Sequence, residues 1–180
     1  MSKLDFFVSV ITSSYKEIAM NNILKIFYAF LTVAVTSVIC SYFTQFGINT
    51  FYDSLIKPPF LPANQLFPVA WSFLYALMII SYYLVLKDHS YAEFRPATLM
   101  FLGQLFLQML WTYLFFFGAY FLFAGIVILL LLWTVAEMIK SFKQLNQFAA
   151  YLQYPYFLWL IFAAYLNFGI IYLNGNTLNL

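Results

Sequence analysis

The sequence predicts an all-α membrane protein, built as a bundle of five transmembrane helices with a long loop between the first two. Of its 180 residues, 65% are hydrophobic and only 8% are charged, whereas about a quarter of the residues of an ordinary soluble domain are charged. The longest uncharged run, residues 96–136, would be about twice as long as the hydrocarbon layer is thick if it formed one straight helix. Solid apolar runs such as residues 126–133 also lack the alternation of a membrane β-strand.

Each predicted span is an uncharged stretch long enough to cross a bilayer, which takes roughly 20 helical residues. The first stretch follows Lys25, and the second lies between Lys57 and Lys87. The long central run must fold back once, and Gly118 is its natural turning point. The last stretch begins at Gln144. The predicted spans are residues 23–43, 66–86, 97–117, 120–139 and 148–173.

The predicted domain organisation is one transmembrane domain, residues 23–174, with a short extension at each end. Residues 1–22 contain Asp5 and Glu17 and lack a small-residue cleavage site after a long apolar core. We therefore interpret them as an N-terminal extension that forms an interfacial helix, not as a cleaved signal peptide. Residues 175–180 are a C-terminal tail. The sequence shows no internal repeat.

A loop of about 22 residues, 44–65, is expected between the first two spans, which is long for a connection without a function. Prolines stiffen it, and aromatic side chains give it an apolar face. We expect it to fold back over the end of the bundle as a lid; the alternative is an interfacial segment that lies on lipid. The residues concerned are Pro58, Pro59, Pro62, Phe51, Tyr52 and Phe60.

The distribution of cations predicts the orientation, because cytoplasmic loops are enriched in Lys and Arg. Five spans place seven cations on the side of the N-terminus and only Lys57 on the other side. In a bacterial inner membrane, the N-terminus would then be cytoplasmic and the C-terminus outside. The seven are Lys3, Lys16, Lys25, Lys87, Arg95, Lys140 and Lys143. The net charge of +2 gives no reason to expect a nucleic-acid partner.

Three spans carry stripes of aromatic and amide residues at helical spacing. Because side-chain amides are costly against lipid, they should face the bundle interior. An interior lined by indole, phenol and amide groups suits a flat, mostly apolar ligand. From the pattern alone, the plainer interpretation is that the amides join helices and the aromatic residues pack or lie at the membrane interface. The stripes are Trp71, Tyr75, Met78 and Tyr82; Gln104, Gln108, Trp111 and Phe115; and Trp159, Ala163, Asn167, Ile170 and Asn174.

Catalytic and metal-binding constellations are poor. The single His89 excludes a multi-histidine metal site, and the single Cys40 excludes an intrachain disulfide. A haem bound beneath the lid would lack a histidine ligand, which leaves Cys40 or Met78 as weak candidates. Lys57 could pair with a carboxylate of a planar ligand, or it could anchor the loop at lipid headgroups.

Three segments resemble the translocator protein family, also called the TspO/MBR or peripheral benzodiazepine receptor family, in order and at closely similar spacing over residues 25–174. The first comprises Phe51, Tyr52, Leu55, Lys57, Pro58, Phe60, Pro62, Phe67, Pro68, Trp71 and Tyr75. The second comprises Gly103, Gln104, Leu105, Leu107, Trp111, Phe115, Phe116 and Gly118. The third comprises Pro155, Tyr156, Trp159, Phe162, Ala163, Leu166, Asn167 and Asn174.

The resemblance implies a five-helix bundle whose pocket is closed by the first loop, commonly as a dimer. It implies a receptor or sensor that binds tetrapyrroles such as protoporphyrin IX or haem, with the tetrapyrrole as ligand and no required cofactor or metal. The expected ligand-binding residues are Phe51, Tyr52, Lys57, Phe60, Trp71, Tyr75, Gln104, Gln108, Trp111, Phe115, Trp159, Phe162 and Ala163.

Two alternatives to the receptor stay open. In light-dependent porphyrin breakdown, the residues that would matter by resemblance are Trp71 and Trp159. Transport of lipid or porphyrin is the other, but the missing repeat and the expected absence of broken helices count against a conventional transporter.

The sequence also departs from the family pattern. Phe51 and Phe60 replace loop tryptophans, Gln108 replaces an asparagine, and Ile128 stands where an aspartate is usual. Tyr172 stands where the family's cholesterol-contact pattern needs a basic residue, which argues against sterol as a ligand.

Overall fold

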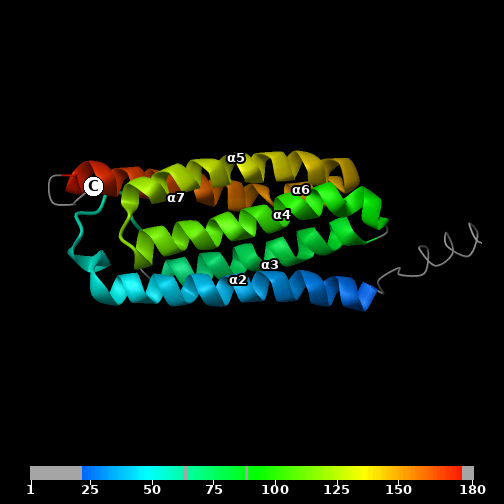
Figure 1. The fold of residues 1–180 in the computed structure, drawn as a ribbon, viewed down its shortest axis with the longest axis horizontal. Coiled ribbons are helices and arrows are strands. Elements are labelled where there is room, and N and C mark those ends of the chain that lie inside the picture. Colours follow the sequence, from blue (N-terminus) through cyan, green and yellow to red (C-terminus); the bar gives the residue numbers. More distant parts are fainter. Residues whose placement is uncertain (1–21, 63–64, 88, 176–180) are drawn as a thin grey trace, which may run out of the picture.

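The computed structural model of the chain describes residues 22–62, 65–87 and 89–175. This part of the chain contains helices and connecting segments but no β-strand, and five of its helical segments are long and apolar enough to cross a membrane. Figure 1 shows these segments running side by side along the long axis of the molecule. The predicted fold class, an all-α bundle with five spanning segments, is confirmed.

The helices follow the predicted order. The first two spanning segments are α2, Asn22–Thr50, and α3, Leu66–Leu86, with the short 3-10 turn η1, Tyr52–Ser54, between them. The third is α4, Tyr91–Thr112, extended by a π-helical turn, η2, Tyr113–Phe117. The fourth is α5, Phe121–Leu145, and the fifth combines α6, Gln147–Tyr151, with α7, Tyr154–Asn174.

The first helix is longer than predicted, so the expected loop over residues 44–65 is wrong in its first part. Residues 44–50 contain no proline and continue α2 to Thr50, whose hydroxyl donates to the carbonyl of Phe46 at 2.8 Å. The connection therefore covers residues 51–65. The predicted N-terminal extension, apart from Asn22, and the predicted tail, apart from Gly175, lie outside the described residues.

The third spanning segment begins earlier than the predicted residue 97. A capping box starts α4: the backbone N–H of Ser90 donates to Oε2 of Glu93 at 2.7 Å, and the Ser90 side chain accepts from the backbone of Glu93. Glu93 and Arg95 thus belong to the helix, with Pro96 accommodated inside it. The charged residues that bounded the predicted span therefore do not end the helix.

The fifth segment is interrupted, against the expectation of unbroken helices. The side chain of Asn146 accepts from the backbone N–H of Ala149 at 2.9 Å and caps α6, and Pro155 stands in the first turn of α7. Leu152 and Gln153 lie between the two helices. The break lies near one end of the bundle, whereas the broken helices of transporters meet near the bilayer midplane.

The predicted reversal at Gly118 occurs, through a π-helical turn. The backbone N–H of Gly118 donates to the carbonyl of Tyr113 at 2.9 Å, and Ala119 has a positive φ of 53°. The turn packs closely on α2: a Cβ atom on Gly47 would lie 2.4 Å from the carbonyl oxygen of Phe116. Only glycine permits this backbone approach.

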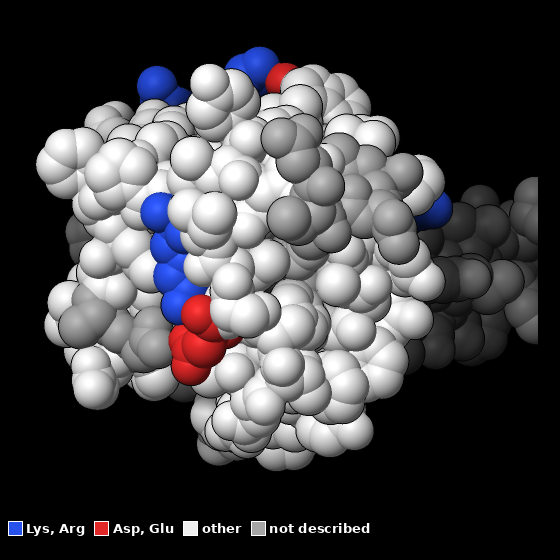
Figure 2. Space-filling model, turned by 90° about the vertical axis from the view of Figure 1, so that its left-hand side faces the viewer, with Lys and Arg blue, Asp and Glu red and all other residues white. Residues whose placement is uncertain are grey.

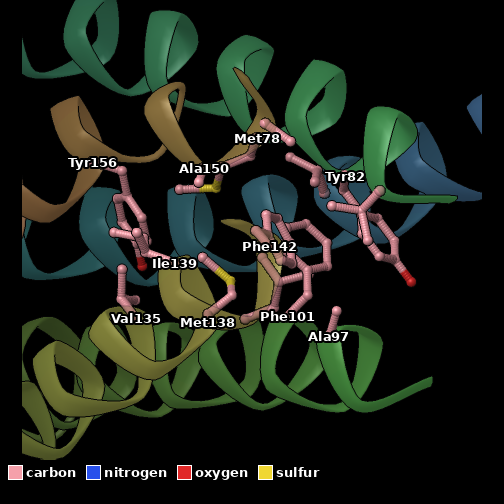
Figure 3. Close-up of a cluster of buried hydrophobic side chains, with 14 of the residues drawn as sticks. Met78, Tyr82, Ala97, Phe101, Val135, Met138, Ile139, Phe142, Ala150 and Tyr156 are labelled. Carbon is pink, nitrogen blue, oxygen red and sulfur yellow. The ribbon is translucent and has the colours of Figure 1, made fainter. Parts of the chain in front are cut away.

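The two halves of the bundle differ in packing. In the half that holds the α3–α4 and α5–α6 connections, a large cluster of buried side chains surrounds Tyr82 and Phe101, whose rings stack with centroids 4.0 Å apart. Figure 3 shows this cluster between the helices. A smaller cluster around Phe115 and Phe121 occupies the other half. We call these the packed half and the open half.

Candidate ligand-binding site

A cavity of 330 Å³ lies in the open half, among α2, α3, α4, η2 and α7. It is lined mainly by aromatic and small polar side chains. The lining residues are Ser37, Cys40, Ser41, Thr44, Gln45, Ile48, Tyr52, Phe67, Pro68, Trp71, Ser72, Tyr75, Gln108, Trp111, Thr112, Phe115, Phe116, Trp159, Phe162, Ala163 and Leu166.

One wall of the cavity is aromatic and comes from α3, α4 and α7. The ring centroids of Trp71 and Tyr75 are 5.4 Å apart, and those of Trp71 and Trp159 are 6.3 Å apart at an interplanar angle of 79°. Trp111 and Phe115 stack at 5.5 Å. Together these faces offer several surfaces on which a planar ring could stack.

The facing wall, from α2, carries hydroxyl and amide groups. Ser37, Ser41, Thr44 and Gln45 all line the cavity, because the spacings i, i+4, i+7 and i+8 bring residues to one face of a helix. The sequence interpretation missed these residues. A polar stripe on an otherwise apolar span was the signal that could have found them.

Buried amides fix the aromatic side chains in place. Nε2 of Gln108 donates to the hydroxyl of Tyr75 at 2.8 Å, and Nε1 of Trp111 donates to Oδ1 of Asn167 at 3.1 Å. The hydroxyl of Tyr156 donates to Oε1 of Gln104 at 2.8 Å. These amides are buried, as the sequence predicts. Asn167 and Gln104 join helices and do not line the cavity, while Gln108 does both.

Most of the predicted ligand-binding residues come together around the cavity, where a ligand could reach them. Their role in binding stays a prediction. Those that line it are Tyr52, Trp71, Tyr75, Gln108, Trp111, Phe115, Trp159, Phe162 and Ala163.

Four predicted residues lie away from the cavity lining. Phe51 packs edge-on against Phe121 at 6.0 Å, outside the cavity. Phe60 points outward, with 89% of its surface exposed and a positive φ of 64°. Gln104 is fully buried between helices. The fourth, Lys57, lies above Tyr52 on the loop.

Tyr52 closes the end of the cavity, and charged groups lie over it. Its ring is buried against Phe116, with centroids 5.6 Å apart. The ammonium of Lys57 lies 4.6 Å from the centroid of the Tyr52 ring and 3.0 Å from Oδ1 of Asp53. Burial, and secondarily the Asp53 carboxylate, raises the pKa of Tyr52 above its ordinary value. The hydroxyl therefore stays neutral at physiological pH.

The 51–65 connection is fastened to the end of α7. The side-chain amide of Asn174 pairs with the backbone of Ile56 in both directions: Oδ1 accepts from the N–H at 2.9 Å and Nδ2 donates to the carbonyl at 2.8 Å. The hydroxyl of Tyr165 donates to the carbonyl of Pro59 at 2.8 Å. Figure 2 views this end and shows a basic group against an acidic one on a largely uncharged surface. That the connection acts as a lid stays a prediction.

The two proposed haem ligands differ in position. Cys40 lines the cavity, whereas Met78 is buried in the packed half and does not reach it. Within the described residues, no three His, Cys, Asp or Glu side chains are grouped so that they could hold a metal ion. His89 lies beyond α3, at the opposite end of the bundle from the cavity.

Comparison with known proteins gives consistent matches across this bundle. The model of the TspO/MBR family matches residues 28–173. The chain is 35% identical over 154 residues to the tryptophan-rich protein TspO of Archaeoglobus fulgidus, which covers 86% of this chain and 99% of that protein. It is 33% identical to the tryptophan-rich sensory protein of Cereibacter sphaeroides, covering 71% of this chain and 79% of that protein. It is 34% identical to the translocator protein of Ovis aries, covering 65% and 70%.

Proposed function

Because this chain belongs to the TspO/MBR family of integral membrane proteins, we propose that it is a membrane receptor for tetrapyrroles such as protoporphyrin IX and haem. The observation that carries the proposal is the cavity with an aromatic wall facing a hydroxyl-rich wall. A tetrapyrrole has the same two-sided character, with a flat apolar macrocycle and carboxylates at one edge. Stacking would hold the ring, and hydrogen bonds would fix its edge.

The arrangement of charges supports one orientation of the ligand. Lys57 is the only cation among the described residues at this end of the bundle, and it lies directly above the Tyr52 ring that closes the cavity. A porphyrin whose carboxylates point toward the 51–65 connection would bring them near this ammonium. Carboxylates in the opposite, packed half would meet buried apolar side chains, which is costly for a charge.

We also propose the orientation and the assembly that the sequence predicts. Lys25, Lys87, Arg95, Lys140 and Lys143 belong to the end opposite Lys57, which supports a cytoplasmic location of that end in a bacterial inner membrane. The homodimer rests on family resemblance. Crosslinking in native membranes, with cysteine labelling from either side, tests both.

The test of porphyrin binding compares changes at tryptophans that line the cavity with a change at one that does not. Purified protein is titrated with protoporphyrin IX in the dark, and the shift of the porphyrin absorption band reports binding independently of tryptophan emission. We expect saturable binding that the double change of Trp71→Phe and Trp159→Phe weakens by up to roughly 150-fold, the limit reached if two stacking contacts worth about 1.5 kcal/mol each were lost completely.

The matched control is Trp133→Phe. Trp133 is 60% exposed on α5 and does not line the cavity, so binding should be unchanged. No saturable binding by the unmodified protein, or equal weakening by Trp133→Phe, would overturn the proposal.

A second candidate function is light-dependent breakdown of the bound porphyrin, with oxygen as the oxidant. It is supported by the contact between Trp71 and Trp159 at the cavity, because an indole next to an excited porphyrin can donate an electron. Illumination in air would then bleach bound porphyrin, and either Trp→Phe change would stop the bleaching. Bleaching at the same rate in both variants would leave the receptor function alone.

A further inference from the structure

The exposed part of the cavity lining lies on only two helices. Four of the lining residues are exposed on the surface of the bundle: Ser41 and Gln45 on α2, and Pro68 and Ser72 on α3. The lining residues from α4, η2 and α7 are buried or half-buried. The cavity therefore opens sideways, between α2 and α3. We call these four residues the seam.

The seam lies in the outer part of two helices that are long and apolar enough to span a membrane. Ser72 is the seventh residue of α3, so it lies about 9 Å along the helix from its start. Ser41 lies nine residues before the end of α2, or about 13 Å along that helix. Both belong to segments that are apolar and long enough to span a membrane. In a membrane, exposed side chains at Ser41 and Ser72 would therefore meet lipid chains, while Gln45 and Pro68 lie nearer the helix ends.

The seam offers hydrogen-bonding groups that the described protein does not use. The side chains of Ser41 and Gln45 make no hydrogen bond within this part of the chain, while the Ser72 hydroxyl donates back to the carbonyl of Pro68. Exposed polar groups without a partner at the edge of the hydrocarbon layer give a polar ligand in the membrane a reason to bind there.

The end of the bundle, by contrast, is closed. Tyr52 is only 5% exposed, and its ring packs on Phe115 and Phe116. The connection that carries it is held by the two-way pairing of Asn174 with Ile56. Passage through this end would break those contacts, whereas the four seam residues form no hydrogen bond between α2 and α3.

We propose that ligands enter the cavity sideways from the bilayer, through the seam between α2 and α3. The ligand class that this route selects is a membrane-dissolved planar amphiphile whose polar edge exchanges hydrogen bonds with Gln45 and Ser41 as it passes. The inference rests on the proposed receptor function for the identity of the ligand. The opening between α2 and α3 does not depend on which ligand binds, so it can be tested without one.

The first test needs no porphyrin. In the Trp133→Phe background, the three remaining tryptophans, Trp71, Trp111 and Trp159, all line the cavity. The protein is placed in bilayers of lipid with brominated acyl chains, which quench tryptophan emission on contact. We expect clear quenching, and we expect Ser41→Phe and Ser72→Phe each to reduce it, because a ring in the seam keeps lipid chains out. Unchanged quenching in both variants would overturn the proposal.

The matched control is Val38→Phe, which adds a ring at a lipid-facing position of α2 that is 68% exposed and lies outside the cavity lining. It should leave the quenching as it was. Equal loss with Val38→Phe would mean that any added ring disturbs the lipid contact, and the proposal would fall. Far-ultraviolet circular dichroism and thermal unfolding establish that each variant is folded.

The second test measures rates with protoporphyrin IX delivered from vesicles. Because a narrower route slows entry and exit alike, Ser41→Phe and Ser72→Phe should each lower both the association and the dissociation rate constant by at least about 10-fold. Loss of a contact with the bound ligand would instead raise the dissociation rate constant. If instead Asn174→Ala speeds entry while the seam variants do not slow it, ligands pass the 51–65 connection and the proposal is wrong. Failure of the unmodified protein to bind porphyrin at equilibrium would overturn the receptor function, and the bromolipid result would still decide the route.

Discussion

Replacing Ala163 by Phe is expected to abolish porphyrin binding while leaving the bundle folded. Ala163 is a buried residue of α7 that lines the cavity, so a phenyl ring at this position would extend into the space between the two walls. That ring would occupy part of the 330 Å³ in which the macrocycle is proposed to lie. We expect affinity to fall at least about 100-fold, equivalent to about 2.7 kcal/mol or more, as measured by titration in the dark.

The control for this variant is Leu158→Phe on the same helix. Leu158 is 64% exposed and does not line the cavity, so the same ring faces lipid and binding should persist. If Ala163→Phe bound porphyrin as tightly as the unmodified chain, the ligand would lie elsewhere in the bundle. The thermal unfolding midpoints of the two variants show whether binding is lost because the cavity is filled or because the protein is misfolded.

Adding a single methyl group at Gly47 is expected to have the largest effect on stability. The new Cβ in Gly47→Ala would meet the backbone of Phe116 at 2.4 Å from its carbonyl oxygen, and backbone cannot move aside as a flexible side chain can. Helix α2 and the π-helical turn must separate, at a cost of about 1–3 kcal/mol. Reversible unfolding in mixed detergent micelles measures the loss.

Gly103→Ala is the matched control, because a Cβ at Gly103 would meet nothing within 4 Å. There the change only improves helix propensity, so stability should stay equal or rise by up to about 1 kcal/mol. Equal loss in the two variants would show that the contact between Gly47 and Phe116 does not determine the stability of this end.

The fold could be predicted from the sequence because hydrocarbon imposes a simple requirement. A run of some 20 apolar residues between charges crosses the membrane, and the span between Lys57 and Lys87 was predicted at the residues, Leu66–Leu86, where the structure has it. The helix ends were harder. Thr50 and Glu93 belong to helices that continue past the ends of the predicted spans. Hydropathy predicts the stretch that can cross the membrane, but local interactions decide where the helix ends.

The candidate site could be predicted where residues are large and recur at helical spacing. Trp71, Tyr75 and Trp111 line the cavity as expected. The hydroxyl wall was missed because Ser and Thr inside a membrane helix commonly bond to their own backbone, as Ser37 does with Ala34. Phe60 was predicted from its place in the loop motif, but its positive φ turns the ring outward, and a single sequence gives no sign of that backbone conformation.

The contrast between a packed half and an open half has a mechanical consequence. Close packing around Tyr82 and Phe101 makes one half of the bundle stiff, while the other half surrounds an unfilled volume of 330 Å³ and is more compliant. A ligand seated among Trp71, Trp111 and Trp159 would fill this volume and make the stiffness of the two halves more alike. The bundle could then signal occupancy to a neighbour as a loss of motion, with little displacement of any helix.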